Sequence, residues 1–84
     1  MERRDHLMII AEILRIARKG VKKTHLVYKA NLNHALLEKY LVKLEKQGLI
    51  SRNIESERKI QTTERGKQFV EKFLCLQEAM PFLP

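Results

Sequence analysis

A cluster of lysines in the first third of the chain is the feature best suited to binding chemistry. Lys19, Lys22, Lys23 and Lys29 supply four positive charges in an interval without a single acidic residue. The whole chain shares this bias, since seventeen Lys and Arg against ten Asp and Glu give a formal net charge of +7. The excess favours an anionic partner, with nucleic acid as the first candidate. Composition alone does not separate DNA, RNA, anionic lipid and a merely soluble surface.

No residue pattern typical of an enzyme accompanies these lysines. The chain has no glycine-rich phosphate loop and no Ser/His/Asp or Cys/His grouping on a recognisable scaffold. The closest acidic pair, Glu55 and Glu57, is most simply interpreted as solubilising charge. The three histidines lack metal-ligand spacing, and a single cysteine, Cys75, cannot form an internal disulfide. We therefore expect no catalytic activity, no cofactor and no metal.

Length and composition indicate one cytoplasmic domain. The chain has 84 residues, 44% of them hydrophobic and 32% charged, a balance typical of globular proteins and unlike a disordered or membrane-spanning chain. The start, MERRDHLMIIAEIL, has basic residues before an apolar run, as a secretory signal does. Glu12 and Arg15 break that run, and no small-residue cleavage site follows. We therefore predict a cytoplasmic protein without a membrane interaction.

Apolar periodicity predicts three helices in the first half, over residues Arg4 to Lys19, Lys22 to Ala30 and His34 to Gln47. The stripe of the first comprises Leu7, Ile10, Ala11, Leu14 and Ala17, widened by Ile9, Ile13 and Ile16. The second should turn Leu26, Val27 and Ala30 inward. The third should bury Leu36, Tyr40, Leu41 and Leu44, with Leu37 at the border. Gly20 and Gly48 supply stop signals after the first and third helices.

A tight corner is expected between the second and third helices, at Asn31-Leu32-Asn33. Asparagine tolerates the left-handed backbone conformation that ends a helix, which suits Asn31. Asn33 is a good N-cap, because its side chain can accept from an otherwise unpaired backbone N–H. Leu32 can point into the core between them. The unit is a helix, a short turn and a longer helix.

Alternating residues after Gly48 predict a small β-hairpin followed by a last helix. The alternation involves Ile50, Arg52 and Ile54 in one segment and Arg58, Ile60 and Thr62 in the other. Either Thr62 or Thr63 can cap the helix that begins TERGKQFVEKF, and Pro81 should stop it. The expected fold class is mainly α with a small hairpin: three helices, a β wing and a C-terminal helix.

This arrangement is that of a winged helix-turn-helix, and two segments carry a more specific likeness. KTHLVYKANLNHALLEKYLVKLEKQGLI and IQTTERGKQFVE resemble the archaeal winged helix-turn-helix family, which includes small dimeric DNA-binding proteins paired through their C-terminal helices. The family usually has a large apolar residue where this chain has Thr62. The resemblance implies a DNA-binding domain over residues 1–62. It also implies a dimerisation helix and tail over 63–84, continuous with that domain.

In a helix-turn-helix the third helix enters the major groove, while the preceding helix and the wing hold the backbone. The outward residues of the third helix are His34, Ala35, Glu38, Lys39, Val42 and Lys43. The candidate DNA-binding residues are Lys22, Lys23, Thr24, Asn33, His34, Ala35, Glu38, Lys39, Lys43, Arg52, Arg58 and Lys59. Lys22, Lys23 and Thr24 stand at a predicted helix N-terminus, where free N–H groups also attract phosphate. A solvated helix face is the alternative interpretation.

Three residues have alternative roles. Glu38 could accept from cytosine N4, or it could pair with Lys39 or Lys43 and read nothing. Tyr28 and Tyr40 are both predicted to pack in the core or at the corner, although the Tyr28 hydroxyl could instead donate to phosphate.

The last helix is too apolar for one small core. We expect a dimer interface formed by Phe69, Phe73, Leu76, Met80 and Phe82. The alternative is that the helix and tail fold back over the monomer.

The predicted function is double-stranded DNA binding by a dimer, as transcriptional regulator or small chromosomal protein. The rival is a winged-helix module that docks on a larger protein assembly. Double-stranded RNA is disfavoured because its deep, narrow major groove excludes a helix.

Overall fold

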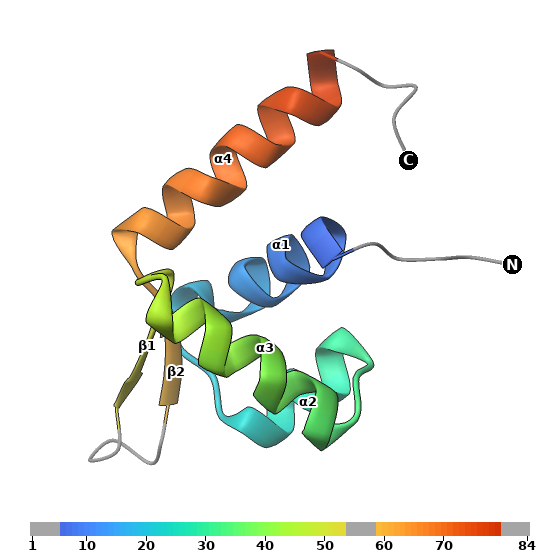
Figure 1. The fold of residues 1–84 in the computed structure, drawn as a ribbon, viewed down its shortest axis with the longest axis vertical. Helices are drawn as coiled ribbons and strands as arrows, with labels where there is room; N and C mark the ends of the chain where they lie inside the picture. The colour runs from blue at the N-terminus through green and yellow to red at the C-terminus, as the bar shows by residue number, and fades with distance from the viewer. Residues whose placement is uncertain (1–5, 54–58, 80–84) are drawn as a thin grey trace, which may run out of the picture.

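The computed structural model describes residues 6–53 and 59–79, which form helices around a small hairpin (Figure 1). The elements in chain order are α1 (His6–Ile16), the 3-10 turn η1 (Ala17–Lys19), α2 (Lys23–Ala30), α3 (His34–Lys46), β1 (Ile50–Asn53), β2 (Lys59–Thr62) and α4 (Glu64–Ala79). The predicted class, mainly α with a β wing and a C-terminal helix, is confirmed. In Figure 1, α1 lies between α4 on one side and α2 and α3 on the other.

The corner before α3 has the predicted geometry. Asn31 adopts the left-handed conformation with φ 56° and ψ 48°, and its N–H donates to the carbonyl of Val27. Asn33 caps α3, its Oδ1 accepting from the N–H of Leu36 at 2.7 Å. Leu32 between them is buried. Local sequence signals therefore set the turn, as expected from the chemistry of asparagine.

The core is formed by one face of each helix together with the hairpin. The largest fully buried side chains are Ile13, Leu14, Leu26, Leu37, Leu41 and Ile60. Two predicted core positions are wrong, since Leu7 is 51% exposed and Leu36 is 38% exposed. Tyr40, Leu41 and Leu44 are buried as predicted, so the buried stripe of α3 differs from the predicted one at a single position. Leu37, expected at the border, is wholly buried in place of Leu36.

The hairpin is antiparallel, with Ile50 opposite Thr62 and Arg52 opposite Ile60. Its free edge is partly covered, because the N–H and C=O of Val21, between η1 and α2, bond to Ile60 at 2.9 and 2.7 Å. The predicted positions Ile54 to Arg58 lie outside the described residues. The wing therefore joins the helices through backbone hydrogen bonds as well as through side chains.

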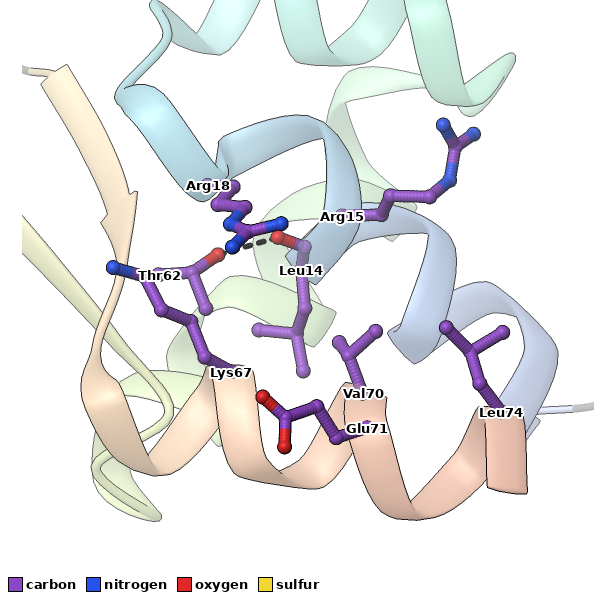
Figure 2. A pocket seen from close by; sticks show the side chains of 8 residues that line it. All are labelled: Leu14, Arg15, Arg18, Thr62, Lys67, Val70, Glu71 and Leu74. Atoms are coloured by element: carbon purple, nitrogen blue, oxygen red, sulfur yellow. Dashed lines mark hydrogen bonds between the residues drawn. The ribbon is translucent and has the colours of Figure 1, made fainter. Parts of the chain in front are cut away.

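The base of the wing is held by polar contacts that the sequence pattern does not reveal. Thr62, where a large apolar residue is usual, is buried, and its hydroxyl donates to the carbonyl of Leu14 at 2.6 Å (Figure 2). Thr63, and not Thr62, caps α4, accepting from the N–H of Gly66 at 3.1 Å while donating to the Gly48 carbonyl. A Cβ at Gly66 would collide with the carbonyl of Leu49. Only glycine allows α4 to approach the wing this closely.

Candidate nucleic-acid interface

The second helix, the third helix and the wing lie on the side of α1 away from α4 (Figure 1). Polar side chains of all three meet at Glu38. Eight of the predicted DNA-binding residues are exposed there: Lys22, Thr24, Asn33, His34, Ala35, Lys39, Lys43 and Lys59. Three others, Lys23, Glu38 and Arg52, are half-buried. Arg58 lies outside the described residues. The fold therefore brings residues from α2, α3 and the wing strands within reach of one ligand.

The three half-buried residues contact one another. Lys23 Nζ on α2 lies 2.7 Å from Glu38 Oε1 on α3. Arg52 on β1 donates to the same carboxylate from the other side, with Nη2 3.1 Å from Oε2 and Nη1 3.4 Å from Oε1. Glu38 thus accepts from cations on two other elements. We call Lys23, Glu38, Arg52 and Glu45 the Glu38 cluster.

Glu45 is the second acid of this cluster. Its Oε1 lies 3.6 Å from Arg52 Nε, close enough for electrostatic attraction but too long for a hydrogen bond. Arg52 Nε is buried and has no hydrogen-bond partner among the described residues. Two cations and two carboxylates make the cluster electrically neutral as a whole. It is a neutral centre on a strongly basic protein.

The cations change the acidity of Glu38. Its pKa is lowered below the ordinary value, first by the hydrogen bond from Lys23, then by that from Arg52 and by the charges of both residues. Partial burial opposes this shift. Glu38 is therefore a firmly ionised partner of two cations.

The ion pairs of Glu38 involve other partners than the two lysines of the same helix that the sequence suggested. Glu38 pairs with Lys23 and Arg52 and not with Lys39 or Lys43, its near neighbours on the helix. Residues 15 and 14 positions away in the sequence supply the partners. Helical spacing indicates only near neighbours. The cluster forms where α2 and the wing cross α3.

The remaining outward side chains of α3 are not engaged in this way. Lys39 and Lys43 are exposed and form no ion pair within residues 6–53 and 59–79. Val42, on the same outward side, is 40% exposed. Asn33 has its Oδ1 committed to the helix cap, which leaves the amide N–H groups for an outside acceptor. The exposed side of α3 thus combines free cations with small apolar groups.

The two tyrosines have different environments. Tyr40 is buried as predicted, and its hydroxyl lies 2.7 Å from His6 Nδ1, a contact that ties the start of α1 to α3. The packed position predicted for Tyr28 is wrong, because this residue is 84% exposed on α2. The buried face of α2 is occupied by Leu26 and Ala30, which leaves Tyr28 on the opposite side.

Three of the predicted dimer-interface residues, Phe69, Phe73 and Leu76, lie on α4, which runs beside α1 (Figure 1). Phe69 and Phe73 are half-buried, whereas Leu76 is 49% exposed. Its neighbour Leu74 is 50% exposed and lines a groove between α1 and α4, together with Leu14, Val70 and basic side chains (Figure 2). Met80 and Phe82 lie outside the described residues. The first half of α4 packs on the core, and its second half presents uncovered leucines.

A helix-turn-helix followed by a two-stranded wing defines a winged helix-turn-helix protein. A model of the winged helix-turn-helix family matches residues 3–80, and the chain belongs to that family. It is similar to the crystal structure of Sso10a-2, a DNA-binding protein from Sulfolobus solfataricus, with 32% sequence identity and a TM-score of 0.74. The match covers 92% of this chain and 85% of that one. No curated protein sequence matches the chain.

The family membership confirms the resemblance seen in the sequence. It also places the chain outside the enzymes, as predicted. Among the described residues, no helix is long and apolar enough to cross a bilayer.

Proposed function

We propose that this protein is a cytoplasmic, dimeric winged-helix protein that binds double-stranded DNA through α3, as a transcriptional regulator or a small chromosomal protein. The observation that carries the proposal is the winged helix-turn-helix geometry with exposed lysines on α3. Similarity to a protein described as DNA-binding supports it. A helix with one solvent-facing side and a flanking wing fits the dimensions of a major groove.

The exposed lysines supply the affinity. Lys39 and Lys43 project from the outward side of α3, and Lys22 and Lys59 lie on flanking elements. Each lysine that neutralises a phosphate releases a condensed counterion, so binding should weaken steeply as salt is added. We expect His34 and Ala35, at the start of α3, to contact base edges, because the N-terminal half of a recognition helix enters the groove first.

The uncovered second half of α4 supports the dimer. Leu74 and Leu76 are each about half exposed, and two such leucines on one helix favour a covering partner. In a two-fold pair, the same side of α4 in both protomers would be buried, and two α3 helices could reach successive major grooves. A dimer would therefore make about twice as many phosphate contacts as a single protomer.

The test is binding to a mixed-sequence duplex across a salt series, with the mass of the protein determined in the same buffer. We expect affinity to fall with roughly the sixth to eighth power of salt concentration if a dimer makes that many phosphate contacts. Lys39→Gln combined with Lys43→Gln should reduce the exponent by roughly 1.8 per bound protomer, at about 0.9 per contact.

Lys72→Gln is the matched control, because Lys72 is an exposed lysine on α4. It should leave the exponent unchanged. Absence of binding by the folded protein at low salt would contradict DNA binding and favour a module that docks on another protein.

A further inference from the structure

The Glu38 cluster occupies the middle of the proposed DNA-binding face, yet it is arranged to keep cations away from DNA. Lys23 and Arg52 are two of the residues that the sequence suggests as phosphate contacts. Both donate to a single carboxylate of the same chain, at 2.7 and 3.1 Å. Hydrogen bonds between full charges at these distances are the strong class. A phosphate can take either cation only by competing with Glu38.

Arg52 is the more strongly held of the two cations. Its side chain is only 25% exposed, against 35% for Lys23, and it has a carboxylate on each side. Nη1 and Nη2 face Glu38, while Nε faces Glu45. Reorienting this guanidinium toward a phosphate would leave two carboxylates beside the DNA with reduced compensation. Arg52 therefore holds β1 against α3.

The same cluster removes a difficulty with an acid on a DNA-binding helix. An unpaired carboxylate near phosphate is unfavourable, and Glu38 points outward from the middle of α3. With two cations on it, Glu38 adds no net negative charge to the face. In exchange, the face loses two cations that would otherwise bind phosphate of any sequence.

We propose that Glu38 restrains sequence-independent binding by withholding Lys23 and Arg52 from the DNA backbone, without itself contacting a base. The inference rests on the proposed DNA-binding function. Non-specific affinity comes almost entirely from phosphate contacts. A residue that lowers the number of these contacts therefore weakens binding to DNA of any sequence.

The test is the affinity of Glu38→Gln for a mixed-sequence duplex in a salt series. Glutamine keeps the size of the side chain but removes the charge that holds the two cations, which leaves Arg52 only its weaker contact with Glu45 at 3.6 Å. We expect roughly tenfold tighter binding at moderate salt and an exponent larger by roughly 1.8 per bound protomer. Unchanged or weaker binding would overturn the inference, because the carboxylate would then either do nothing or help to hold the DNA.

Glu12→Gln controls for the loss of one negative charge. Glu12 also pairs with an arginine, at 2.9 Å from Arg15, and it lines a groove formed with α4. Its substitution makes the same change in net charge away from α3. A gain as large as that of Glu38→Gln would overturn the inference, since charge alone would then explain both results.

A double-mutant comparison identifies the source of the gain. Lys23→Gln and Arg52→Gln should each cost several-fold more affinity in the Glu38→Gln background than in the wild type. Lys43→Gln should cost the same factor in both backgrounds, because Lys43 is exposed and lies outside the cluster. Equal costs in both backgrounds for Lys23 and Arg52 would overturn the inference.

The outcomes also separate this inference from the proposed function. If neither the wild type nor Glu38→Gln binds DNA at low salt, the DNA-binding proposal itself is wrong. If the wild type binds DNA and Glu38→Gln gains nothing over Glu12→Gln, only the role of Glu38 is wrong. Circular dichroism of each variant establishes that it is folded.

Discussion

The α3 face and the α4 face differ in whether a single chain completes their interactions. On the α3 face, charged residues from three elements pair with one another, and Glu38 has both of its partners within the chain. On the α4 face, Leu74 and Leu76 are each about half exposed, so the described residues cover only part of each side chain. Paired charge and uncovered leucine indicate different uses. We propose a charged ligand for the first face and another copy of the chain for the second.

The largest effect should come from a charge placed on the α4 face. Leu76→Asp would put a carboxylate into the proposed interface, and desolvating it there is strongly unfavourable. We expect the dimer dissociation constant to rise at least about a hundredfold, measured by sedimentation, with DNA affinity falling in parallel. Because Leu76 is 49% exposed, the monomer itself should remain folded.

Gln68→Asp is the matched control, since Gln68 is an exposed residue of the same helix. It should leave the association constant within a few-fold of the wild type. A dimer that survives Leu76→Asp intact would show that α4 does not form the interface.

The next effect concerns the junction between the two faces. Gly66→Ala would force a methyl group against the carbonyl of Leu49 and the side chain of Thr62. Overpacking of this kind typically lowers the free energy of unfolding by about 1–3 kcal/mol. We expect a loss near the upper end of this range, because the Leu49 carbonyl belongs to the backbone and cannot move aside as easily as a side chain. Urea unfolding at fixed protein concentration measures the loss. The exposed Gln68→Ala on the same helix should change the free energy of unfolding by no more than about 0.5 kcal/mol.

Thr62→Val should have a smaller effect at the same junction. Valine keeps the shape but removes the hydroxyl that donates to the Leu14 carbonyl at 2.6 Å. The carbonyl would lose this partner in a buried site, at a cost of about 1–2 kcal/mol. Unfolding by urea should show this loss, and equal stability of the two proteins would mean that the hydrogen bond contributes nothing net.

The smallest effect is the pH dependence of the Glu38 cluster. Because the pKa of Glu38 is lowered in the folded state, its carboxylate stabilises the fold above its unfolded pKa, and this contribution is lost as pH falls through the folded value. The stability difference between the wild type and Glu38→Gln should therefore be constant near neutral pH and shrink in acid. Since the Glu38 side chain is 40% exposed, solvent screening keeps the difference small.

Urea unfolding of the wild type and of Glu38→Gln at a series of acidic pH values measures this difference in the free energy of unfolding. A gap that stays the same down to the lowest pH at which both proteins fold would contradict the ion-pair assignment.

Sequence reasoning was accurate where neighbouring residues determine the structure. Asn31 and Asn33 act through backbone groups within a few positions of themselves, so the corner and the start of α3 could be predicted. The exposed position of Lys39 and Lys43 also follows from the helical period. The choice between Leu36 and Leu37 on α3 could not be predicted, because the two are equally apolar and tertiary packing decides which one is buried.

Contacts between distant segments were beyond the sequence. Thr62 lies 48 positions from Leu14 in the sequence, and its hydroxyl donates to the Leu14 carbonyl. This hydrogen bond stands where an apolar side chain would make packing contacts. Glu38 and Arg52 meet only because β1 packs against α3. The predicted roles changed most for residues, such as Glu38 and Arg52, that lie where two elements distant in the sequence pack together.

The most direct test of the whole account is an amide-proton NMR titration of the isotope-labelled protein with a mixed-sequence duplex. Both faces are then observed in one experiment. We predict that resonances of α3, the start of α2 and the wing strands shift on addition of DNA. Resonances around Leu74 and Leu76 should instead change when the free protein is diluted. Shifts caused by DNA on α4 and not on α3 would contradict the assignment of the two faces.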